Sequence, residues 1–515
     1  MNGADRLCDA LLVNGVDVCF ANPGTSEMHF VAALDRKPQM RCVLGLFEGV
    51  VTGAADGYAR MAEKPAATLL HLGPGLANGL ANIHNAKRAR TPMINVVGDH
   101  ASYHLQHDAP LTSDIEGLAR PMSHWVGRAT GPDDVAQTCA AAYAAAMSTP
   151  GISTMILPAD AAWSEAKDTP LSPTAIPVPE AISADALKAA VAALRSGRKA
   201  ALLLAGGALR EGALVTAGRI AAATGASLFS QVSGRGERGA GRVYARPVPY
   251  PIDMAITALA DLEVVVCIGG RAPVGFFAYP GKPGVLLPPG CEVVELARQG
   301  QDLAAALDAL ADALNAPREK PATSGWTARD LPRPTGALNP DNISLTVARA
   351  LPEGAIICDE ALTSGGRYAV LAPTMAPHDH LPITGGSIGI GIPLATGAAV
   401  GAPGRKVVTL QADGSGMYTV QGLWTQAREK LDVVTIVFSN RAYAILQGEM
   451  RNVGVNAFGR NASRMLNLNE PDLDWVSLAK GMGVEAARAT TIEEFMDLFD
   501  TALKQSGPFL IEAVI

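Results

Sequence analysis

The chain has 515 residues, of which 48% are hydrophobic and 18% charged, and its formal net charge at pH 7 is −7. A domain usually holds about 100–200 residues, so this length predicts about three domains. The hydrophobic fraction excludes a disordered chain, which combines low hydrophobicity with high net charge. The mildly acidic balance argues against a nucleic-acid partner, because phosphate binding needs clustered Lys and Arg.

The opening residues, the apolar stretches and the cysteines indicate where in the cell the protein is located. No basic segment followed by an apolar run opens the chain, and no stretch reaches the ~18 consecutive apolar residues that a membrane helix needs. The seven cysteines are scattered and form no CxxC pair. An odd, dispersed set of this kind is typical of reduced thiols in a reducing compartment. We therefore expect a cytoplasmic protein that binds no membrane.

The first part of the chain alternates apolar runs with helical patterns. Apolar strands are predicted at 42–48, 66–73 and 92–99, with a helix at 49–63 and another after the Gly-rich loop GPGLANG. Strands that are apolar on both faces are typical of parallel sheets covered by helices. This pattern predicts an α/β domain over residues 1–165.

Two proline-rich segments, 171–182 and 317–340, are interpreted as linkers to further domains. Between them, the runs ALLLAGG and VVVCIGG each end in a glycine turn, as buried strands of an α/β sheet do. We expect three doubly wound α/β domains with parallel sheets, over residues 1–165, 183–318 and 338–515.

The most informative motif is QADGSG in the last part of the chain. Asp413 ends one apolar strand, and Asn440, 27 residues later, ends the next. Because parallel strands joined by a helix end at the same sheet edge, the two side chains are expected close together, where ligands bind. A carboxylate and an amide oxygen suit a hard cation such as Mg²⁺. The glycines and the following helix start favour phosphate. For DGSG alone, an ordinary strand-to-helix turn remains the alternative.

This pattern resembles the signature of thiamin-diphosphate-dependent enzymes, Gly-Asp-Gly followed one strand later by Asn-Asn. The chain departs from the signature at Ala412 and Ser439 but keeps the aspartate and the second asparagine. The resemblance implies Mg²⁺ held by Asp413, Asn440 and the backbone carbonyl of Ala442, together with bound thiamin diphosphate.

The resemblance also implies residues around the cofactor. Ile388 stands where the family places a bulky apolar residue that supports the bent cofactor between its two rings; an ordinary core isoleucine is the alternative. Thr363, after the strand AIICDE, is expected to contact the diphosphate or the pyrimidine. Gly386, Gly414 and Ser415 complete the expected contacts. FAD, which several family members bind in the middle domain, is expected to be absent.

Glu48 ends the run CVLGLFE and begins a helix of small residues. Taken alone, it is a helix-start residue favoured by the macrodipole. The resemblance implies a catalytic role, in which Glu48 hydrogen-bonds N1′ of the aminopyrimidine and promotes activation of the cofactor for attack on a 2-oxo acid. In the family, Glu48 and Asp413 would belong to different subunits, which implies at least a dimer and usually a tetramer.

Within this family, NPGTSE, FEGVVTGAADGYAR and LLHLGPG are similar to segments of the benzoylformate decarboxylases. By position, Thr25 matches their substrate-binding serine and His71 their first active-site histidine, a candidate proton donor. Their second active-site histidine has no counterpart in GGRAPVGFFAYPG. His29 is a further candidate for the pocket. Ile445 and Glu449 stand where the wall of an aryl pocket is expected.

The expected activity is decarboxylation of a 2-oxo acid with C–C bond formation to a second carbonyl, similar to acetolactate synthases. The missing second histidine, and Glu449 as a poor wall for a phenyl ring, favour small aliphatic substrates. Ile388 in place of methionine, and the lack of a synthase-like tryptophan after Asn440, favour the alternative, a benzoylformate-decarboxylase-type enzyme that releases an aldehyde. A catalytically silent, cofactor-binding scaffold is a third possibility, against which the retention of Glu48 and Asp413 argues.

Overall fold

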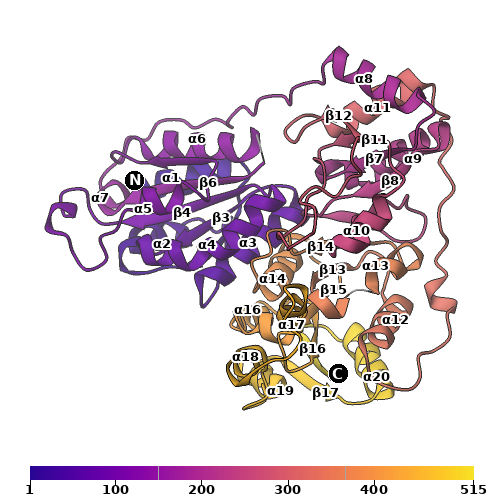
Figure 1. Ribbon diagram of the computed structural model, residues 1–515. Helices are drawn as coiled ribbons and strands as arrows, with labels where there is room; N and C mark the ends of the chain where they lie inside the picture. The colour runs from indigo at the N-terminus through magenta and orange to yellow at the C-terminus, as the bar shows by residue number, and fades with distance from the viewer. Residues whose placement is uncertain (149, 366) are drawn as a thin grey trace.

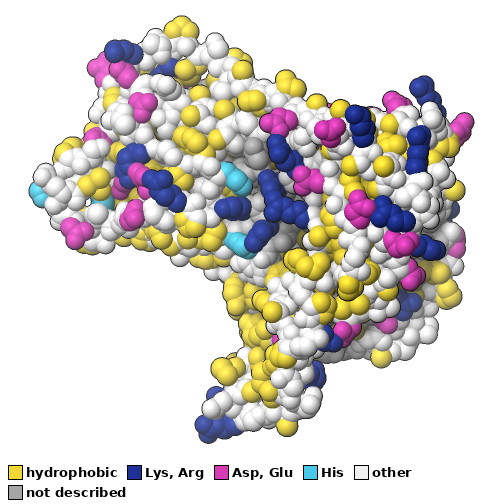
Figure 2. Space-filling model, turned by 45° about the horizontal axis from the view of Figure 1, so that its top comes forward, with side chains coloured by type: hydrophobic (Ala, Val, Ile, Leu, Met, Phe, Trp, Pro, Cys, Tyr) yellow, Lys and Arg dark blue, Asp and Glu magenta, His cyan; other side chains and the backbone are white. Residues whose placement is uncertain are grey.

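A computed structural model describes residues 1–148, 150–365 and 367–515. Three sheets follow one another along the chain, each with helices packed on its faces (Figure 1). On the face of the molecule drawn in Figure 2, Lys and Arg side chains lie among Asp and Glu side chains. In the described residues every pairing between named strands is parallel except one. The predicted class, α/β with three doubly wound parallel sheets, is confirmed. We find no helix in these ranges whose length and apolar character would let it span a membrane.

The first sheet has six strands in the order β2-β1-β3-β4-β6-β5. The order reverses between β1 and β3, and open α/β sheets bind ligands outside the carboxyl ends of the strands at such a point. Strands β3, β4 and β6 are buried along their whole length, which explains their continuous apolar sequences. The elements are β1 (Val18–Asn22), β2 (Arg41–Leu44), β3 (Ala66–Leu70), β4 (Met93–Asp99), β5 (Trp125–Arg128), β6 (Ile152–Pro158), α1 (Gly3–Val13), α2 (Met28–Asp35), α3 (Glu48–Ala62), α4 (Leu72–Ala89), α5 (Ile115–Ala119), α6 (Val135–Ser148) and α7 (Ala159–Trp163), with 3₁₀ turns η1 (Thr25–Glu27) and η2 (Leu105–His107).

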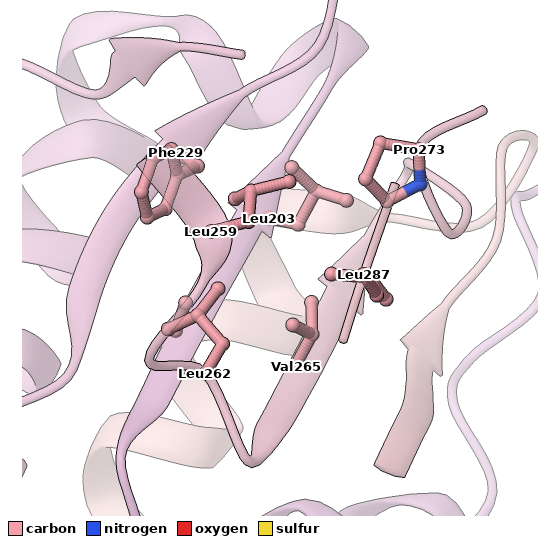
Figure 3. Close-up of a pocket in the computed structure, with 8 residues that line it drawn as sticks. Leu203, Phe229, Leu259, Leu262, Val265, Pro273 and Leu287 are labelled. Carbon is pink, nitrogen blue, oxygen red and sulfur yellow. The ribbon is translucent and has the colours of Figure 1, made fainter. Parts of the chain in front are cut away.

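The middle sheet has five strands in the order β10-β8-β7-β11-β12. Figure 3 shows a pocket on one of its faces, lined by aliphatic side chains together with Phe229 and Pro273. Because this lining carries no polar side chain, the pocket is a feature of core packing and offers no group for chemistry. The elements are β7 (Ala200–Leu204), β8 (Ser227–Ser230), β10 (Arg246–Pro247), β11 (Val264–Ile268), β12 (Glu292–Ala297), α8 (Ala184–Arg195), α9 (Glu211–Thr224), α10 (Ile252–Leu259), α11 (Leu303–Leu314) and η3 (Gly206–Leu209).

The third sheet has seven strands in the order β17-β18-β16-β15-β13-β14-β9, and its order reverses between β13 and β15. The same rule therefore points to the carboxyl ends of these two strands as a ligand site. The elements are β9 (Gly236–Arg238), β13 (Ile356–Glu360), β14 (His378–Pro382), β15 (Val407–Ala412), β16 (Val433–Ser439), β17 (Glu485–Ala489), β18 (Phe509–Val514), α12 (Pro340–Ala350), α13 (Tyr368–Leu371), α14 (Gly391–Gly401), α15 (Asp413–Gly416), α16 (Gly422–Arg428), α17 (Ala444–Asn452), α18 (Arg460–Leu466), α19 (Trp475–Gly481) and α20 (Ile492–Lys504), with η4 (Ala328–Asp330), η5 (Leu362–Gly365) and η6 (Ala372–Thr374).

Strand β9 breaks the order of the domains. It belongs to the chain segment of the middle domain but pairs antiparallel with β14 at the edge of the third sheet. Beside it, Arg235 Nε donates to Asp379 Oδ1 at 2.6 Å, and Arg405 Nη2 donates to Oδ2 of the same carboxylate. The sequence does not predict this exchange, because the three-residue strand Gly-Glu-Arg has no alternation of polar and apolar residues.

Helices α3 and α14 join the first and third domains by backbone contact, and Figure 1 shows them side by side. A Cβ added to Gly57 would lie 2.0 Å from the carbonyl oxygen of Leu394, and one added to Gly397 would lie 1.7 Å from that of Ala54. Any side chain at these two glycines would push the helices apart. The small residues after Glu48 are therefore explained by this contact.

Arg60, near the end of α3, contacts all three domains. Its guanidinium forms a buried ion pair with Asp56 at 2.6 Å. It also donates to the carbonyl oxygens of Gly234 at 3.0 Å and Pro382 at 2.8 Å. Because a buried charge is tolerated only when it is paired and hydrogen-bonded, these contacts fix how the three domains meet.

Candidate active site

Asp413 and Asn440 meet at the carboxyl edge of the third sheet. β15 pairs with β16, so the residues after the two strands are neighbours. Asp413 is 2% exposed; its Oδ1 accepts from Gly414 N at 2.8 Å and its Oδ2 from Arg441 N at 2.7 Å. The Asn440 Oδ1 accepts from Ala442 N at 3.0 Å. The three expected metal ligands thus lie on two neighbouring segments, directly after β15 and β16.

The chemistry of this edge fits a hard cation. Burial raises the pKa of Asp413, and the backbone N–H groups of Arg441 and Gly414 act against that rise. A buried carboxylate beside an amide oxygen and a backbone carbonyl is the oxygen set that Mg²⁺ accepts. No group of three or more His, Cys, Asp or Glu in the described ranges could hold a metal, and the expected set, with a single carboxylate, is of a different kind.

Gly414 and Ser415 follow on α15. A Cβ added to Gly414 would lie 2.5 Å from Cε1 of Tyr443, so the close packing of this turn requires glycine. The Ser415 side chain is turned inward: its hydroxyl accepts from Gln411 Nε2 at 2.7 Å and donates to the carbonyl of Ala412 at 3.2 Å. Contacts from Ser415 to a diphosphate are therefore expected from its backbone.

The segment around Ile388 is anchored by a carboxylate that the sequence analysis did not single out. Glu360, the last residue of β13, is 1% exposed. It accepts from the backbone N–H groups of Gly389 at 2.6 Å, Ile390 at 3.2 Å and Gly391 at 2.7 Å. These contacts fix the backbone directly after the half-buried Ile388. The signal that could have found Glu360 is its place at the end of a strand next to β15.

Glu360 also connects this turn to β15, the strand that ends just before Asp413. Gln411 Nε2, on β15, donates to Glu360 Oε2 at 3.0 Å and to Ser415 Oγ at 2.7 Å. Burial raises the pKa of Glu360, and the Gln411 amide and the three backbone N–H groups oppose the rise. One buried carboxylate thus connects the segment of Ile388 with the segment of Asp413.

Gly386 and Thr363 lie at the same sheet edge. Gly386 has a φ of +75°, a conformation that favours glycine. Thr363 is exposed on η5, which directly follows β13. Both positions are compatible with contact to a ligand held outside β13 and β15.

Glu48 lies at the carboxyl edge of the first sheet, as the first residue of α3. Glu48 is 7% exposed, and its Oε2 accepts from Asn78 Nδ2 at 3.0 Å. A Cβ added to Gly75 would come within 3.1 Å of Glu48 Oε1, so the Gly-rich loop lets α4 approach the carboxylate. Asn78 was missed by the sequence analysis, since asparagines on a helix carry no signal of their own.

Thr25 and His71 lie at the same edge as Glu48. Thr25 is exposed and begins η1 after β1, and His71 follows β3. The His71 Nδ1 is 2.8 Å from Glu27 Oε2, which also accepts from Gly24 N at 2.8 Å. Glu27 is 3% exposed and its Oε1 is buried without a hydrogen bond in the described structure. Glu27 therefore orients the imidazole, a role that the motif NPGTSE suggests only in retrospect.

Two sets of candidate residues share no hydrogen bond within the described chain. The ring of His29 packs edge-on against Trp163 of α7, with centroids 5.3 Å apart, and no hydrogen bond in the described residues joins it to His71. Likewise, no hydrogen bond in those residues joins Glu48 to Asp413 or Asn440. The two domains do touch close to these residues, because Asn82 Nδ2 of α4 donates to the carbonyl of Gly49 at 2.8 Å and to that of Gly389 at 3.3 Å.

Ile445 and Glu449 lie on α17, which begins just after Ala442. The Glu449 carboxylate does not stand free, because the Tyr279 hydroxyl of the middle domain donates to its Oε2. The same loop of the middle domain reaches the third sheet at a second point, where a Cβ added to Gly386 would lie 2.5 Å from Cζ of Phe276.

Comparisons with known proteins agree with this geometry. Residues 1–118 match the family "Thiamine pyrophosphate enzyme, N-terminal TPP binding domain", and residues 366–513 match the corresponding C-terminal TPP binding domain. The chain is 48% identical over 517 residues to the Mycobacterium tuberculosis protein named "Putative acetolactate synthase large subunit IlvX", covering 100% of this chain and 99% of that one. The chain belongs to the thiamin-diphosphate-dependent enzyme family.

More distant relatives carry two kinds of name. The chain is 27% identical to benzoylformate decarboxylase of Pseudomonas aeruginosa over 97% of this chain and 96% of the relative. The structure of a 4-hydroxybenzoylformate decarboxylase of Rhodococcus jostii superposes with a TM-score of 0.84 at 23% identity, covering 99% of this chain and 98% of the other, and shows the shared fold. Family membership thus establishes the class of cofactor. It does not decide whether the reaction is of the acetolactate synthase type or of the decarboxylase type.

Proposed function

We propose that this protein catalyses the thiamin-diphosphate- and Mg²⁺-dependent decarboxylation of a 2-oxo acid, with transfer of the resulting acyl carbanion equivalent to a second carbonyl. The observation that carries the proposal is the edge where Asp413 and Asn440 meet next to the turn anchored by Glu360. The family supplies the cofactor class, and the 48% identical relative named as an acetolactate synthase supports the carboligase outcome.

In this proposal, the residues at the third sheet bind the metal ion and the cofactor. Asp413, Asn440 and the carbonyl of Ala442 would hold Mg²⁺, and Ile388 would support the cofactor between its rings. Bound thiamin diphosphate supplies a carbanion for addition to the 2-oxo carbonyl and an electron sink for the loss of CO₂. Gly386, Thr363 and the backbone of α15 would contact the pyrimidine and the diphosphate.

The residues of the first sheet would handle protons. Glu48, held by Asn78 at 3.0 Å, would exchange a proton with N1′ of the aminopyrimidine. His71, oriented by Glu27, would give or take a proton at the substrate oxygen or carbon, and Thr25 would hydrogen-bond the substrate carboxylate. Glu27 thereby acts through His71.

The His71–Glu27 pair favours a second candidate function. A histidine that is hydrogen-bonded to a buried carboxylate is a suitable proton donor, and protonation at carbon after CO₂ loss releases an aldehyde. That outcome is the reaction named for the benzoylformate decarboxylase relatives. The two candidates differ only in whether a proton or a second carbonyl reaches the reacting carbon first.

We further propose a cytoplasmic homo-oligomer, at least a dimer and in the family's usual form a tetramer. Glu48 and Asp413 share no hydrogen bond in the described residues of one chain, and this supports a site that is shared between two subunits. All seven cysteines are free in the structure, which suits a reducing compartment.

The test starts from protein stripped of cofactor and reloaded with thiamin diphosphate and Mg²⁺. Pyruvate or benzoylformate is supplied, and CO₂ and the organic product are measured together. Acetolactate from pyruvate supports the carboligase, and benzaldehyde from benzoylformate with pyruvate inert supports the decarboxylase instead. Absence of CO₂ from both acids, in protein shown to retain the cofactor, contradicts a preference for either pyruvate or benzoylformate, and the test then extends to the further 2-oxo acids named below.

A further inference from the structure

We propose that the Tyr279–Glu449 contact holds a loop of aromatic residues from the middle domain over the substrate site, so that the enzyme selects 2-oxo acids with one carboxylate and a branched or aromatic apolar substituent. This inference rests on the proposed function and deepens it by naming the substrate class.

The loop, residues 270–287, runs from the end of β11 towards β12 and contacts the third domain at two points. The Tyr279 hydroxyl donates to Glu449 Oε2 on α17. Phe276 lies against Gly386, where an added Cβ would be 2.5 Å from the ring. α17 carries Ile445, and Gly386 is two residues before Ile388. The loop therefore spans the two segments that the proposed function places beside the cofactor.

Three aromatic rings gather at this place. The Phe276 ring lies 5.5 Å from Tyr250 and 4.9 Å from Phe277, centroid to centroid. The three residues are 53%, 47% and 54% exposed respectively. Each ring is thus packed against its neighbour on one side and open on the other. An open aromatic wall is stabilised by covering an apolar substituent, and a methyl group, with its small area, contributes less than a branched or aromatic one.

In the Tyr279–Glu449 contact, the tyrosine hydroxyl is the donor and the carboxylate keeps its negative charge. Partial burial and the neighbouring carboxylate of Glu449 raise the pKa of Tyr279, so the hydroxyl stays protonated and remains a donor. The second hydrogen bond to Glu449 comes from Asn452 Nδ2 at 3.4 Å. Both partners are neutral, so neither offsets the charge of the carboxylate. That charge would repel a second carboxylate on the substituent of the substrate, which disfavours dicarboxylic 2-oxo acids.

This geometry changes one argument made from the sequence. Glu449 was expected to form the pocket wall itself and so to disfavour a phenyl ring. In the structure its carboxylate is bound to Tyr279, and the wall is supplied by Phe276, Phe277 and Tyr250. The reason for expecting small aliphatic substrates is thereby removed.

The experiment measures kcat and KM for benzoylformate, 4-methyl-2-oxopentanoate, pyruvate and 2-oxoglutarate, by CO₂ release from the holoenzyme. We expect the first two acids to exceed pyruvate in kcat/KM by at least tenfold, the range that apolar pockets achieve for added methylenes (about 10–200-fold). We expect 2-oxoglutarate to be the poorest. A wild-type enzyme that prefers pyruvate or 2-oxoglutarate overturns the inference and leaves the proposed function standing. No CO₂ from any of the four acids overturns both.

Three variants separate the parts of the proposal. Tyr279→Phe and Phe276→Ala should lower the preference for benzoylformate over pyruvate by about tenfold, through KM more than kcat. Glu449→Gln keeps an acceptor for Tyr279 but removes the charge, so it should raise the relative activity with 2-oxoglutarate. Tyr103→Phe, on an exposed residue of the first domain, is the matched control.

The affinity for thiamin diphosphate should stay unchanged in all four variants. If Tyr279→Phe and Phe276→Ala both retain the wild-type substrate preference while they bind the cofactor normally, the loop does not set specificity and the inference is wrong.

Discussion

At the scale of single residues, the candidate site consists of groups at strand ends whose hydrogen bonds leave them little freedom. Asp413, Glu360 and Glu48 are each under 8% exposed and each accepts from a backbone or amide N–H. Enzymes place ionisable groups in such settings to hold them in a fixed geometry. Changes that keep the shape of these side chains and alter only their charge are therefore the informative ones.

The first prediction concerns Glu48. Glu48→Gln should retain thiamin diphosphate and Mg²⁺ but lose about 10²–10⁴-fold in kcat, because the amide cannot take part in proton exchange. Cofactor retention after gel filtration and CO₂ release under saturating substrate check this. A variant that turns over like the wild type would remove Glu48 from the mechanism.

The second prediction concerns Glu360. In Glu360→Gln, the new NH₂ group must face the backbone N–H of Gly389 or that of Gly391, and both are donors. A buried donor left without an acceptor costs about 1–3 kcal/mol. In cofactor-free protein, the free energy of unfolding measured in urea should fall by that amount. The backbone amides of residues 389–391 should also exchange their hydrogens faster. Glu353→Gln, on a residue outside the site, serves as control; equal stability of the two variants would show that Glu360 anchors nothing.

At the scale of elements, β14 has two buried histidines on the strand that pairs with β9. The His378 ring is 2.6 Å from the Tyr368 hydroxyl and 2.6 Å from the carbonyl of Ala376, contacts that suit a neutral imidazole. Burial lowers the pKa of His378 to about 3 and that of His380 to about 4, and the nearby Arg238 adds to both shifts. The element is therefore built for the uncharged form of both rings.

The third prediction follows from these two pKa values. Between pH 6.5 and about 4 the unfolded chain binds protons that the folded chain does not, so stability must fall as the pH drops through this window. Each histidine contributes about 1.4 kcal/mol per pH unit in that window. Urea unfolding at pH 7 and pH 5 measures the loss. His380→Asn should flatten the dependence, and an unchanged slope would mean that His380 is charged in the folded state.

The contact of α3 with α14 yields the fourth prediction. Gly57→Ala places a methyl group 2.0 Å from the Leu394 carbonyl oxygen, so the helices must separate. Overpacking of this kind costs about 1–3 kcal/mol or more. Gly212→Ala in α9 is the matched control, since nothing lies within 4 Å of its added Cβ and alanine is the better helix former. Chemical unfolding should show a loss for the first variant and none for the second.

The sequence predicts an element well when its evidence is local. Continuous apolar runs predict β15 and β16, because a buried strand can be recognised from a few consecutive residues. The ends of these two strands then predict that Asp413 and Asn440 lie close together. Glu360, Asn78 and the Tyr279–Glu449 contact escape prediction, because each depends on a partner brought near by the fold. β9 escapes it for the same reason: its place is set by β14, far along the chain.

At the scale of the whole molecule, the three domains are held by ion pairs that cross their boundaries. Asp379 on β14 is 2% exposed and is bound by Arg235 from the middle domain and Arg405 from its own. Burial alone would raise the pKa of Asp379, but the two guanidinium groups outweigh it and hold that pKa below its usual value. The carboxylate therefore depends on a residue of another domain.

The fifth prediction tests this dependence. Arg235→Ala leaves Asp379 with one partner in a buried place, and breaking a buried pair costs about 3–5 kcal/mol. The loss should be visible in urea unfolding at pH 7 and should become smaller in acid, where the aspartate left with one partner can take up a proton. Arg329→Ala, which removes an exposed arginine, should cost less than about 1 kcal/mol. Equal losses in both variants would show that the domains do not rely on this contact.

The exchange of β9 has a consequence for how such a protein evolves. Recombination between relatives tends to preserve units that fold by themselves, and three α/β domains look like three such units. Here the edge of the third sheet is completed by residues 236–238, which are encoded within the middle domain. A third domain acquired alone would have the five-residue β14 as its edge in place of the three-residue β9, and long open edges invite association with other chains. The middle and third domains of this enzyme must therefore be inherited together.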